Sequence, residues 1–178
     1  ELAGGSMDRR FFYKLGASRL DRKPLCGGVR SMAYSSLFGD AAGMGPEQMA
    51  QSDLIMVWGV NVTVSALHLT RQINIARKAG GRLVVIDPKR TKIAEQADLH
   101  LQLKPGTDVV LGLALAAELD RRGALYEDFL AEWALGADDY RAHARQYDLD
   151  RAADICGLER ADLERLTEWL ATARALST

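Results

Sequence analysis

Cysteine, histidine and proline are scarce in this sequence, which has two, three and four of them among 178 residues. Cys26 and Cys156 match neither a disulfide framework nor a metal-binding spacing, which favours a reducing compartment and a cytoplasmic protein. The net charge is −1 and no basic block occurs, so a nucleic-acid partner is not expected. No apolar run approaches the roughly 18 residues of a membrane span, so direct membrane insertion is not expected either.

The residues that are present suit a globular piece of a larger protein. Apolar residues make up 48% and charged residues 26%, which allows a hydrophobic core in a chain of about one domain's length. The stretch DRRFF at 8–12 resembles a twin-arginine export signal only superficially, because no apolar segment follows it. The chain opens directly into a helix-like segment and closes on a helical pattern without a following strand. We therefore expect a fragment of a multidomain protein.

Short apolar runs alternate with helical patterns along the chain. Continuous apolar runs predict strands near 54–58, 83–87 and 99–103 that are covered on both faces. Apolar residues at helical spacing predict helices at 7–15, around 29–37, and at 66–78, 92–96, 109–122, 127–135, 138–146, 149–156 and 160–176. This alternation predicts an α/β fold, a three-layer Rossmann-like parallel sheet of about three clear strands with a helical C-terminal tail.

Glycine and polar residues follow the first two predicted strands where they end. After the first strand, Gly59 allows close approach to the backbone, Asn61 suits a turn, and Ser65 is placed to cap the next helix. Asp87 ends the second strand, where Rossmann-type sites place an acid that accepts from ribose hydroxyls. Ordinary turns explain each feature separately. Because ligands of open α/β sheets bind outside the carboxyl ends of the strands, the combination favours a nucleotide site.

The third predicted strand runs into the sequence Lys-Pro-Gly-Thr-Asp at 104–108. Gly106 permits positive φ, Thr107 can cap the following helix, and Asp108 lies in its first turn, where negative charge is favoured. These roles explain the segment without a ligand. In the functional alternative, the two carboxylate oxygens of Asp108 match the N1–H and exocyclic amine of guanine, an edge that adenine lacks.

The series of segments resembles the molybdopterin oxidoreductases, the family of dimethyl sulfoxide reductase and formate dehydrogenase. Three segments carry the resemblance over nearly the whole chain: DLIMVWGVNVTVS, ARKAGGRLVVIDPKRTKIAEQADLHLQLKPGTDVVLGLAL and LYEDFLAEWALGADDYRAH. The middle segment is the most specific, because it combines an Ile-Asp-Pro step, a basic residue and a threonine with a later Pro-Gly-Thr-Asp.

The resemblance implies a cofactor and a set of residues that bind it. Family members hold molybdenum or tungsten through the dithiolenes of two pterin guanine dinucleotides. By resemblance, Gly59 and Asn61 approach the pyrophosphate, Asp87 contacts the ribose and Asp108 reads the guanine. The other implied cofactor-binding residues are Trp58, which can wall the pterin, and Lys89, Arg90, Thr91, Gly106 and Thr107.

Two positions depart from the family pattern. Val62 follows Asn61 where the family usually has proline, which predicts a less rigid loop. Lys89 stands where arginine is commoner and cannot form a bidentate fork. Both departures are compatible with dinucleotide binding.

Cys26 is the candidate metal ligand and catalytic residue. In many family members a Cys, selenocysteine or Ser just before a glycine- and alanine-rich helix ligates the metal, and Cys26 precedes such a segment. A thiolate suits a soft metal centre. The alternative is a small buried residue in a close-packed turn. Cys156, Trp133 and Trp169 lie on apolar helical faces and are predicted core residues.

The resemblance also implies a domain organisation. Residues 1–25 would end a neighbouring domain, 26–125 would form the dinucleotide-binding α/β domain, and 126–178 would be its helical extension. The expected partners are the remaining domains of the parent chain and an electron-transfer subunit, and a 4Fe–4S cluster, where the parent has one, lies outside these residues. The intact parent is then expected to catalyse two-electron or oxygen-atom transfer, and the fragment alone is expected to be inactive.

Two alternative classes remain open at this point. A non-catalytic relative, such as the large iron–sulfur subunit of respiratory NADH dehydrogenase, would share the fold without molybdenum chemistry. A NAD- or FAD-binding domain of a thiamine-enzyme type also ends a strand in Ile-Asp, but it gives no reason for the segment ending at Asp108, and the sequence has no GxGxxG.

Overall fold

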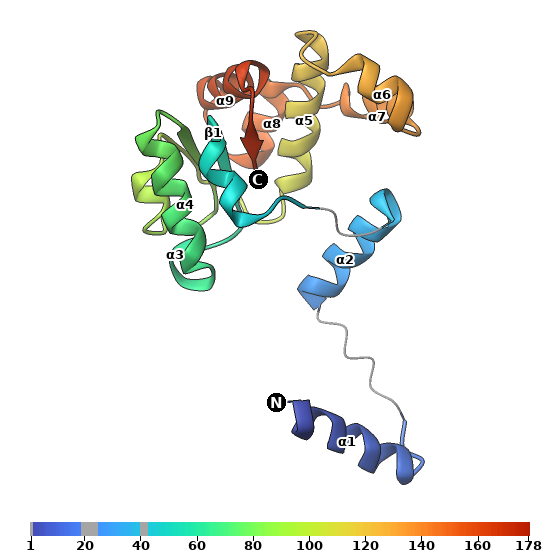
Figure 1. Ribbon diagram of the computed structural model, residues 1–178. Helices are drawn as coiled ribbons and strands as arrows, with labels where there is room; N and C mark the ends of the chain where they lie inside the picture. Colours follow the sequence, from blue (N-terminus) through green and yellow to red (C-terminus); the bar gives the residue numbers. More distant parts are fainter. Residues whose placement is uncertain (1, 19–24, 40–42) are drawn as a thin grey trace. The chain divides into compact units, whose positions relative to one another are not determined.

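The computed structural model describes residues 2–18, 25–39 and 43–178. The chain divides into two compact units, residues 1–43 and 44–178. In the first unit, α1 spans Leu2–Lys14 and α2 spans Leu25–Phe38 (Figure 1). Both helices were predicted, and each begins several residues before its apolar pattern does.

The second unit contains a parallel sheet. Its strands are β1 (Leu54–Trp58), β2 (Arg82–Ile86), β3 (Leu99–Leu101) and β4 (Leu176–Ser177), in the spatial order β3-β2-β1-β4. Every adjacent pair is parallel. This order matches the first four positions of the Rossmann strand order, 3-2-1-4-5-6. The predicted parallel α/β fold is confirmed, although β3 ends two residues before the predicted Leu103 and a fourth strand is added.

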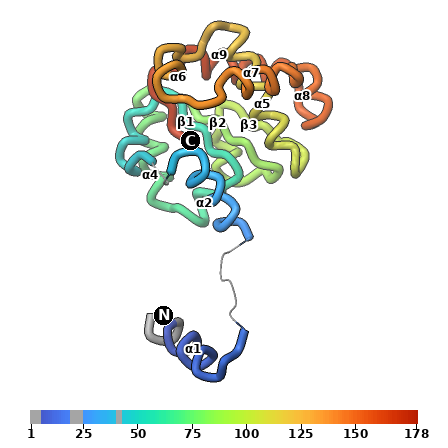
Figure 2. Tube along the Cα trace, turned by 90° about the vertical axis from the view of Figure 1, so that its right-hand side faces the viewer, coloured from blue at the N-terminus to red at the C-terminus, as the bar shows by residue number. Residues whose placement is uncertain are grey.

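Helices cover both faces of this sheet, which makes the second unit three-layered (Figures 1 and 2). Side chains of β1 alternate, so Leu54 and Met56 pack into one core and Ile55 and Val57 into the other. The first core is completed by α5 (Asp108–Arg121), α8 (Leu149–Cys156) and α9 (Arg160–Thr172). The second core is completed by η1 (Pro46–Gln51), α3 (Val62–Ser65), α4 (Leu67–Lys78) and η2 (Ala94–Gln96). Each fully buried aliphatic side chain contributes roughly 1.5–3 kcal/mol.

The helical C-terminal part is confirmed. Its last residues, however, were predicted to be helical and are not. After α6 (Glu127–Trp133), α7 (Ala137–Ala144) and α8, helix α9 ends at Thr172 instead of continuing to 176. Asp53 causes this ending, because its carboxylate accepts the N–H groups of Arg174 and Ala175 at 3.1 and 3.0 Å. The same hydrogen bonds, that from Ala175 foremost, lower the pKa of Asp53. They place Leu176 and Ser177 beside β1 as β4.

Two of the three predicted core residues are confirmed. Cys156 is fully buried, and Trp169 packs against the same core with Arg82 stacked 4.9 Å from its ring centroid. The prediction for Trp133 was wrong, because its side chain is 69% exposed. Helix α6 buries no residue, so the apolar face that Trp133 shares with Phe129 points away from the core.

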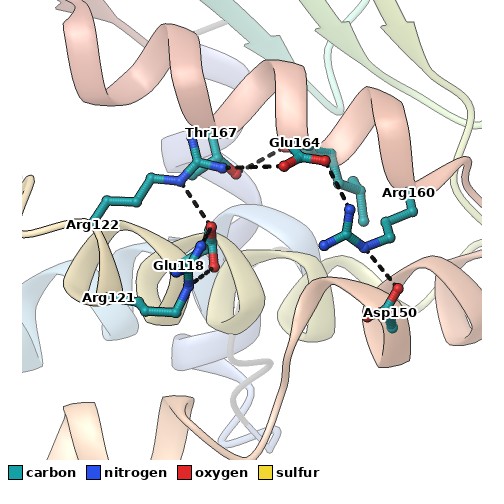
Figure 3. A network of polar contacts seen from close by, with 8 residues as sticks. Glu118, Arg121, Arg122, Asp150, Arg160, Glu164 and Thr167 are labelled. Atoms are coloured by element: carbon teal, nitrogen blue, oxygen red, sulfur yellow. Dashed lines mark hydrogen bonds and ion pairs between the residues drawn. The ribbon is translucent and has the colours of Figure 1, made fainter.

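A network of ion pairs fastens α5 to the helices beside it (Figure 3). Glu118 of α5 accepts hydrogen bonds from Arg121 and Arg122, at 2.7 Å from Arg121 Nε and 2.8 Å from Arg122 Nε. Arg122 lies 4.0 Å from Glu164 of α9, and Arg160 joins Glu164 to Asp150 of α8 with distances of 2.8 Å to each. The network holds α5, α8 and α9 in one arrangement, and α5 carries Asp108 at its N-terminus.

Glu118→Gln is expected to lower the free energy of unfolding at neutral pH by about 1–2 kcal/mol. Hydrogen bonds between charged groups stabilise a fold more than neutral ones, but solvent weakens the bond to Arg121, which is largely exposed. The Arg121 hydrogen bond, opposed by partial burial and reinforced by Arg122, lowers the pKa of Glu118 to about 2. A depressed carboxyl pKa stabilises the fold above the unfolded pKa of about 4.3 and loses that contribution as pH falls toward 2. We therefore expect urea unfolding to show a difference in unfolding free energy between the wild type and Glu118→Gln that is smaller at pH 2.5 than at pH 7. Glu132→Gln, at an exposed position of α6, is the control. A difference that is the same at both pH values contradicts this account.

Candidate functional site

The carboxyl ends of three strands lie in one row at the same edge of the sheet. The register pairs Trp58 with Ile86 and Ile86 with Leu101, which are the last residues of β1, β2 and β3. Backbone pairing continues one residue further, because Gly59 N–H donates to Ile86 O at 2.9 Å and Asp87 N–H to Leu101 O at 3.2 Å. Neighbouring strands lie about 4.8 Å apart, so Gly59 and Asp87 are fixed side by side at this edge.

The loop after β1 turns at Gly59 and is held by its neighbours. Gly59 has a φ of 65°, and a Cβ added there would meet nothing within 4 Å, so its backbone is open to close approach. The carbonyl oxygen of Asn61 accepts the N–H groups of Val64 and Ser65, and its side-chain oxygen accepts from Thr63 Oγ1 at 2.7 Å. Val62, which stands where a proline was expected, is only 2% exposed and anchors the loop in the core.

Of the two predicted helix caps, Ser65 was wrong, and Thr107 was right in its position but not in its side-chain hydrogen bond. Ser65 is the last residue of α3, and Ala66 occupies the N-cap of α4 without a side-chain hydrogen bond. Thr107 does occupy the N-cap of α5, but its hydroxyl donates back to Lys104 O at 2.7 Å. Ser65 misses the N-cap because α3 continues through it, and the N-cap of α5 has no side-chain hydrogen bond to the helix.

Asp87 lies in a tight turn at the end of β2. Its Oδ1 accepts the N–H of Lys89 at 2.7 Å, which folds the Asp-Pro step into an Asx-type turn. Lys89 and Arg90 are exposed beyond it. Thr91 starts the next turn, where its hydroxyl oxygen accepts the Ala94 N–H at 3.3 Å. The structure thus places all four predicted residues in one loop at the row of strand ends.

This loop is also held by hydrogen bonds from β3 and from the segment after it, through two residues that were not predicted site residues. His100 Nε2 lies 2.9 Å from the carbonyl oxygen of Asp87, and Gln102 Nε2 donates to that of Pro88 at 2.8 Å. His100 and Gln102 are two positions apart, so alternation puts both side chains on the same side of the strand. The two-residue spacing of His100 and Gln102, beside the predicted strand that ends in Asp87, could have identified both residues from the sequence.

The segment after β3 is anchored to α8. Lys104 N–H donates to Cys156 O at 2.8 Å, and Cys156 Sγ lies 3.6 Å from Thr107 O. Gly106 adopts the predicted positive φ, 84°. The carbonyl oxygen of Thr107 also accepts the N–H groups of Val110 and Leu111, which begins α5. Asp108 is therefore carried by a loop fixed at both ends.

Trp58 joins the first strand end to the start of α5. Its indole Nε1–H donates to Asp108 Oδ1 at 2.8 Å. Asp108 is otherwise exposed, and Trp58 is half-buried with its ring packed against the α5 side of the core. Both residues were predicted to contact the cofactor, but in separate roles. The structure places Gly59 and Asp87 on neighbouring strand ends and joins Asp108 to Trp58, the residue before Gly59.

Cys26 belongs to the first unit. It is the second residue of α2 and exposed, so it lies within the helix's first turn and not ahead of the helix as predicted. Across residues 2–18, 25–39 and 43–178, no group of three or more His, Cys, Asp or Glu side chains could hold a metal ion. In the same described ranges, no helix is both long and apolar enough to cross a membrane.

The fold and this row of strand ends define a Rossmann-like α/β domain. The sequence model of the molybdopterin oxidoreductases matches residues 10–122. That match covers more than half of the chain, so the chain belongs to the molybdopterin oxidoreductase family. Membership implies a pterin cofactor with molybdenum or tungsten.

Relatives with known names cover different reactions. A probable oxidoreductase of Bacillus subtilis, YoaE, is 34% identical over 168 residues, which are 94% of this chain and 25% of that protein. The F420-dependent formate dehydrogenase 2 subunit alpha of Methanococcus maripaludis is 29% identical over 62% of this chain and 16% of its own length. The structure of acetylene hydratase from Pelobacter acetylenicus superposes with a TM-score of 0.62 and 29% identity, over 71% of this chain and 18% of that one. The chain thus spans a quarter or less of these relatives.

Proposed function

We propose that this chain is the part of a molybdenum or tungsten bis-pterin guanine dinucleotide oxidoreductase that binds one of the two dinucleotides. The observation that carries the proposal is the alignment of Gly59 and Asp87 at one sheet edge, with Asp108 tied to the same edge through Trp58. Family membership supports binding of a pterin and its metal, and the residues at this sheet edge support binding of a nucleotide.

The residues at this edge fit a dinucleotide. The space above Gly59 suits a pyrophosphate close to the backbone. Asp87 uses one oxygen for the Lys89 N–H, and its carboxylate keeps acceptor capacity for two ribose hydroxyls. Asp108 can accept from a base edge with two donors, and guanine has that edge. Lys89 and Arg90 supply positive charge beside the phosphates.

The residues of this chain bind and orient the cofactor. His100 and Gln102 fix the backbone of the Asp87 turn, and α5 fixes Asp108. When bound, the metal supplies two-electron or oxygen-atom transfer. Cys26 would hold the metal by one thiolate, in keeping with the family pattern. The remaining walls of the substrate site, any 4Fe–4S cluster and the electron-transfer partner would be supplied by the longer protein and its partner subunit.

Calorimetric titration of the 178-residue chain with GDP, ADP and 2′,3′-dideoxy-GDP tests the nucleotide site. We expect GDP to bind roughly tenfold or more tightly than ADP, because Asp108 pairs with guanine alone. Dideoxy-GDP should lose a similar factor, because Asp87 then lacks its hydroxyl donors. Equal affinities for GDP and ADP, or no binding of either, contradict the proposal. Metal analysis of the longer protein separates the catalytic reading from a non-catalytic relative.

A further inference from the structure

We propose that Trp58 is a positioning residue that sets guanine selectivity by fixing the orientation of the Asp108 carboxylate. This inference rests on the proposed function, because it assumes that Asp108 reads the base. It assigns to the indole N–H a role beyond walling the pterin.

The surroundings of Asp108 leave its carboxylate in need of an orienting partner. Asp108 is exposed and is the first residue of α5. The backbone N–H groups of Val110 and Leu111, which a first-turn carboxylate could otherwise approach, donate to Thr107 O at 3.0 and 3.2 Å. An aspartate side chain without a fixed partner rotates about two torsions and spends little time with both oxygens facing one ligand.

Trp58 is a rigid donor to that carboxylate. It is the last residue of β1, and its backbone is fixed by the register with Ile86. Its ring packs against the core on the α5 side, with Leu54 and Met56 of the same strand. The indole Nε1–H therefore points from a fixed place, and its 2.8 Å hydrogen bond to Asp108 Oδ1 fixes the plane of the carboxylate.

One such hydrogen bond leaves enough acceptor capacity for guanine. A carboxylate has about four lone-pair sites, so Oδ2 and the second site of Oδ1 stay available to two N–H donors. Held in one plane, the two oxygens match the N1–H and the exocyclic amine together. A rotating carboxylate still accepts one N–H but pays the ordering entropy for the second. Trp58 therefore acts mainly on the contrast between guanine and hypoxanthine, which lacks the amine.

The test titrates the 178-residue chain and its Trp58→Phe variant with GDP and IDP. Phenylalanine keeps an aromatic ring and removes only the N–H and part of the ring volume. We expect the wild-type chain to prefer GDP over IDP by roughly 10- to 100-fold. Trp58→Phe should lower that ratio at least about fivefold, mostly through GDP. A purely structural role would weaken GDP and IDP by the same factor, and an unchanged ratio overturns the inference.

Two controls separate this inference from the proposed function. Trp169→Phe changes another half-buried tryptophan, one that stacks with Arg82 and Arg165, and should leave the ratio unchanged. Asp108→Asn should abolish the preference. If it does so while Trp58→Phe has no effect, Trp58 is excluded and the guanine site stands. If Asp108→Asn also leaves the GDP-to-IDP ratio unchanged, the proposed guanine reading fails, and this inference fails with it.

A second measurement keeps the inference testable even where Trp58→Phe does not fold. The chain has three tryptophans, so its nitrogen–proton spectrum has three indole resonances to assign. The Trp58 Nε1–H resonance should move on Asp108→Ala, which removes its acceptor, in the unliganded chain, and those of Trp133 and Trp169 should not. A Trp58 resonance that stays in place overturns the positioning role.

Discussion

Replacement of Cys26 by alanine in the longer protein is expected to abolish turnover and to leave dinucleotide content close to that of the wild type. The thiolate is the only bond that this chain is proposed to make to the metal, and a soft ligand of that kind tunes the reacting centre directly. The dinucleotide contacts proposed for Gly59, Asp87 and Asp108 lie in the second unit, so loading should not depend on the thiol.

Three measurements check the Cys26 prediction. Turnover should fall below about one hundredth of the wild-type rate, X-ray absorption should show one sulfur ligand fewer at the metal, and pterin content per folded protein should stay within about twofold. Cys26→Ser keeps a hydroxyl ligand and should retain part of the activity. Ser31→Ala changes an exposed residue of the same helix and should change none of the three. Unchanged activity and unchanged coordination in Cys26→Ala would exclude Cys26 as a metal ligand.

The strand ends were predictable because local patterns determine them. A run such as 83–86, apolar at each position, forms a strand only when both faces are covered, and the glycine pair at 80–81 marks where the preceding helix ends. Parallel strands then put their carboxyl ends at one edge, which places Gly59 and Asp87 together without any knowledge of the sheet's details. That much of the fold and of the candidate site follows from periodicity and topology.

The parts that were not predicted depend on contacts between distant residues. Strand β4 has two residues, and it forms because Asp53 accepts backbone N–H groups more than 120 positions later in the chain. The hydrogen bond from Trp58 to Asp108 spans 50 positions and depends on how α5 packs over β1. No local pattern carries such information, since neither residue's neighbours reveal which side chain it will meet.

The prediction that α6 packs its apolar face into the core was wrong for a related reason. Trp133 and Phe129 recur at helical spacing. That pattern indicates an apolar face but does not show whether another part of the chain packs against it. In this chain α6 is fastened through its polar side instead, with Arg141 of α7 donating to Glu127 at 2.6 Å and lying 3.5 Å from Asp120 of α5. Periodicity predicted the helix correctly and its burial incorrectly.

Replacement of Asp108 by asparagine in the longer protein is expected to reduce guanine dinucleotide loading to less than about one tenth, with little loss of stability. Asparagine keeps the size and can still accept from Trp58, but its amide places an N–H against a guanine N–H. The one hydrogen bond to the carboxylate that is lost costs roughly 1.5–3 kcal/mol, which is about tenfold or more in affinity. The structural cost is smaller, because the helix-dipole contribution of an exposed first-turn acid is about 0.3–1 kcal/mol.

Asp162→Asn is the matched control for this prediction. Asp162 also lies in a first turn, that of α9, and also has one side-chain partner, Arg165 at 2.9 Å. Both variants should lower the thermal midpoint by a few degrees, since each loses a similar charge–dipole contribution. Only Asp108→Asn should lower the guanine dinucleotide content per folded protein. If Asp108→Asn loads cofactor normally and melts markedly earlier than Asp162→Asn, then Asp108 stabilises the start of α5 and does not read the base. The hydrogen bond from Trp58 would then be a fastening between β1 and α5, and selectivity would have to reside in residues outside this edge.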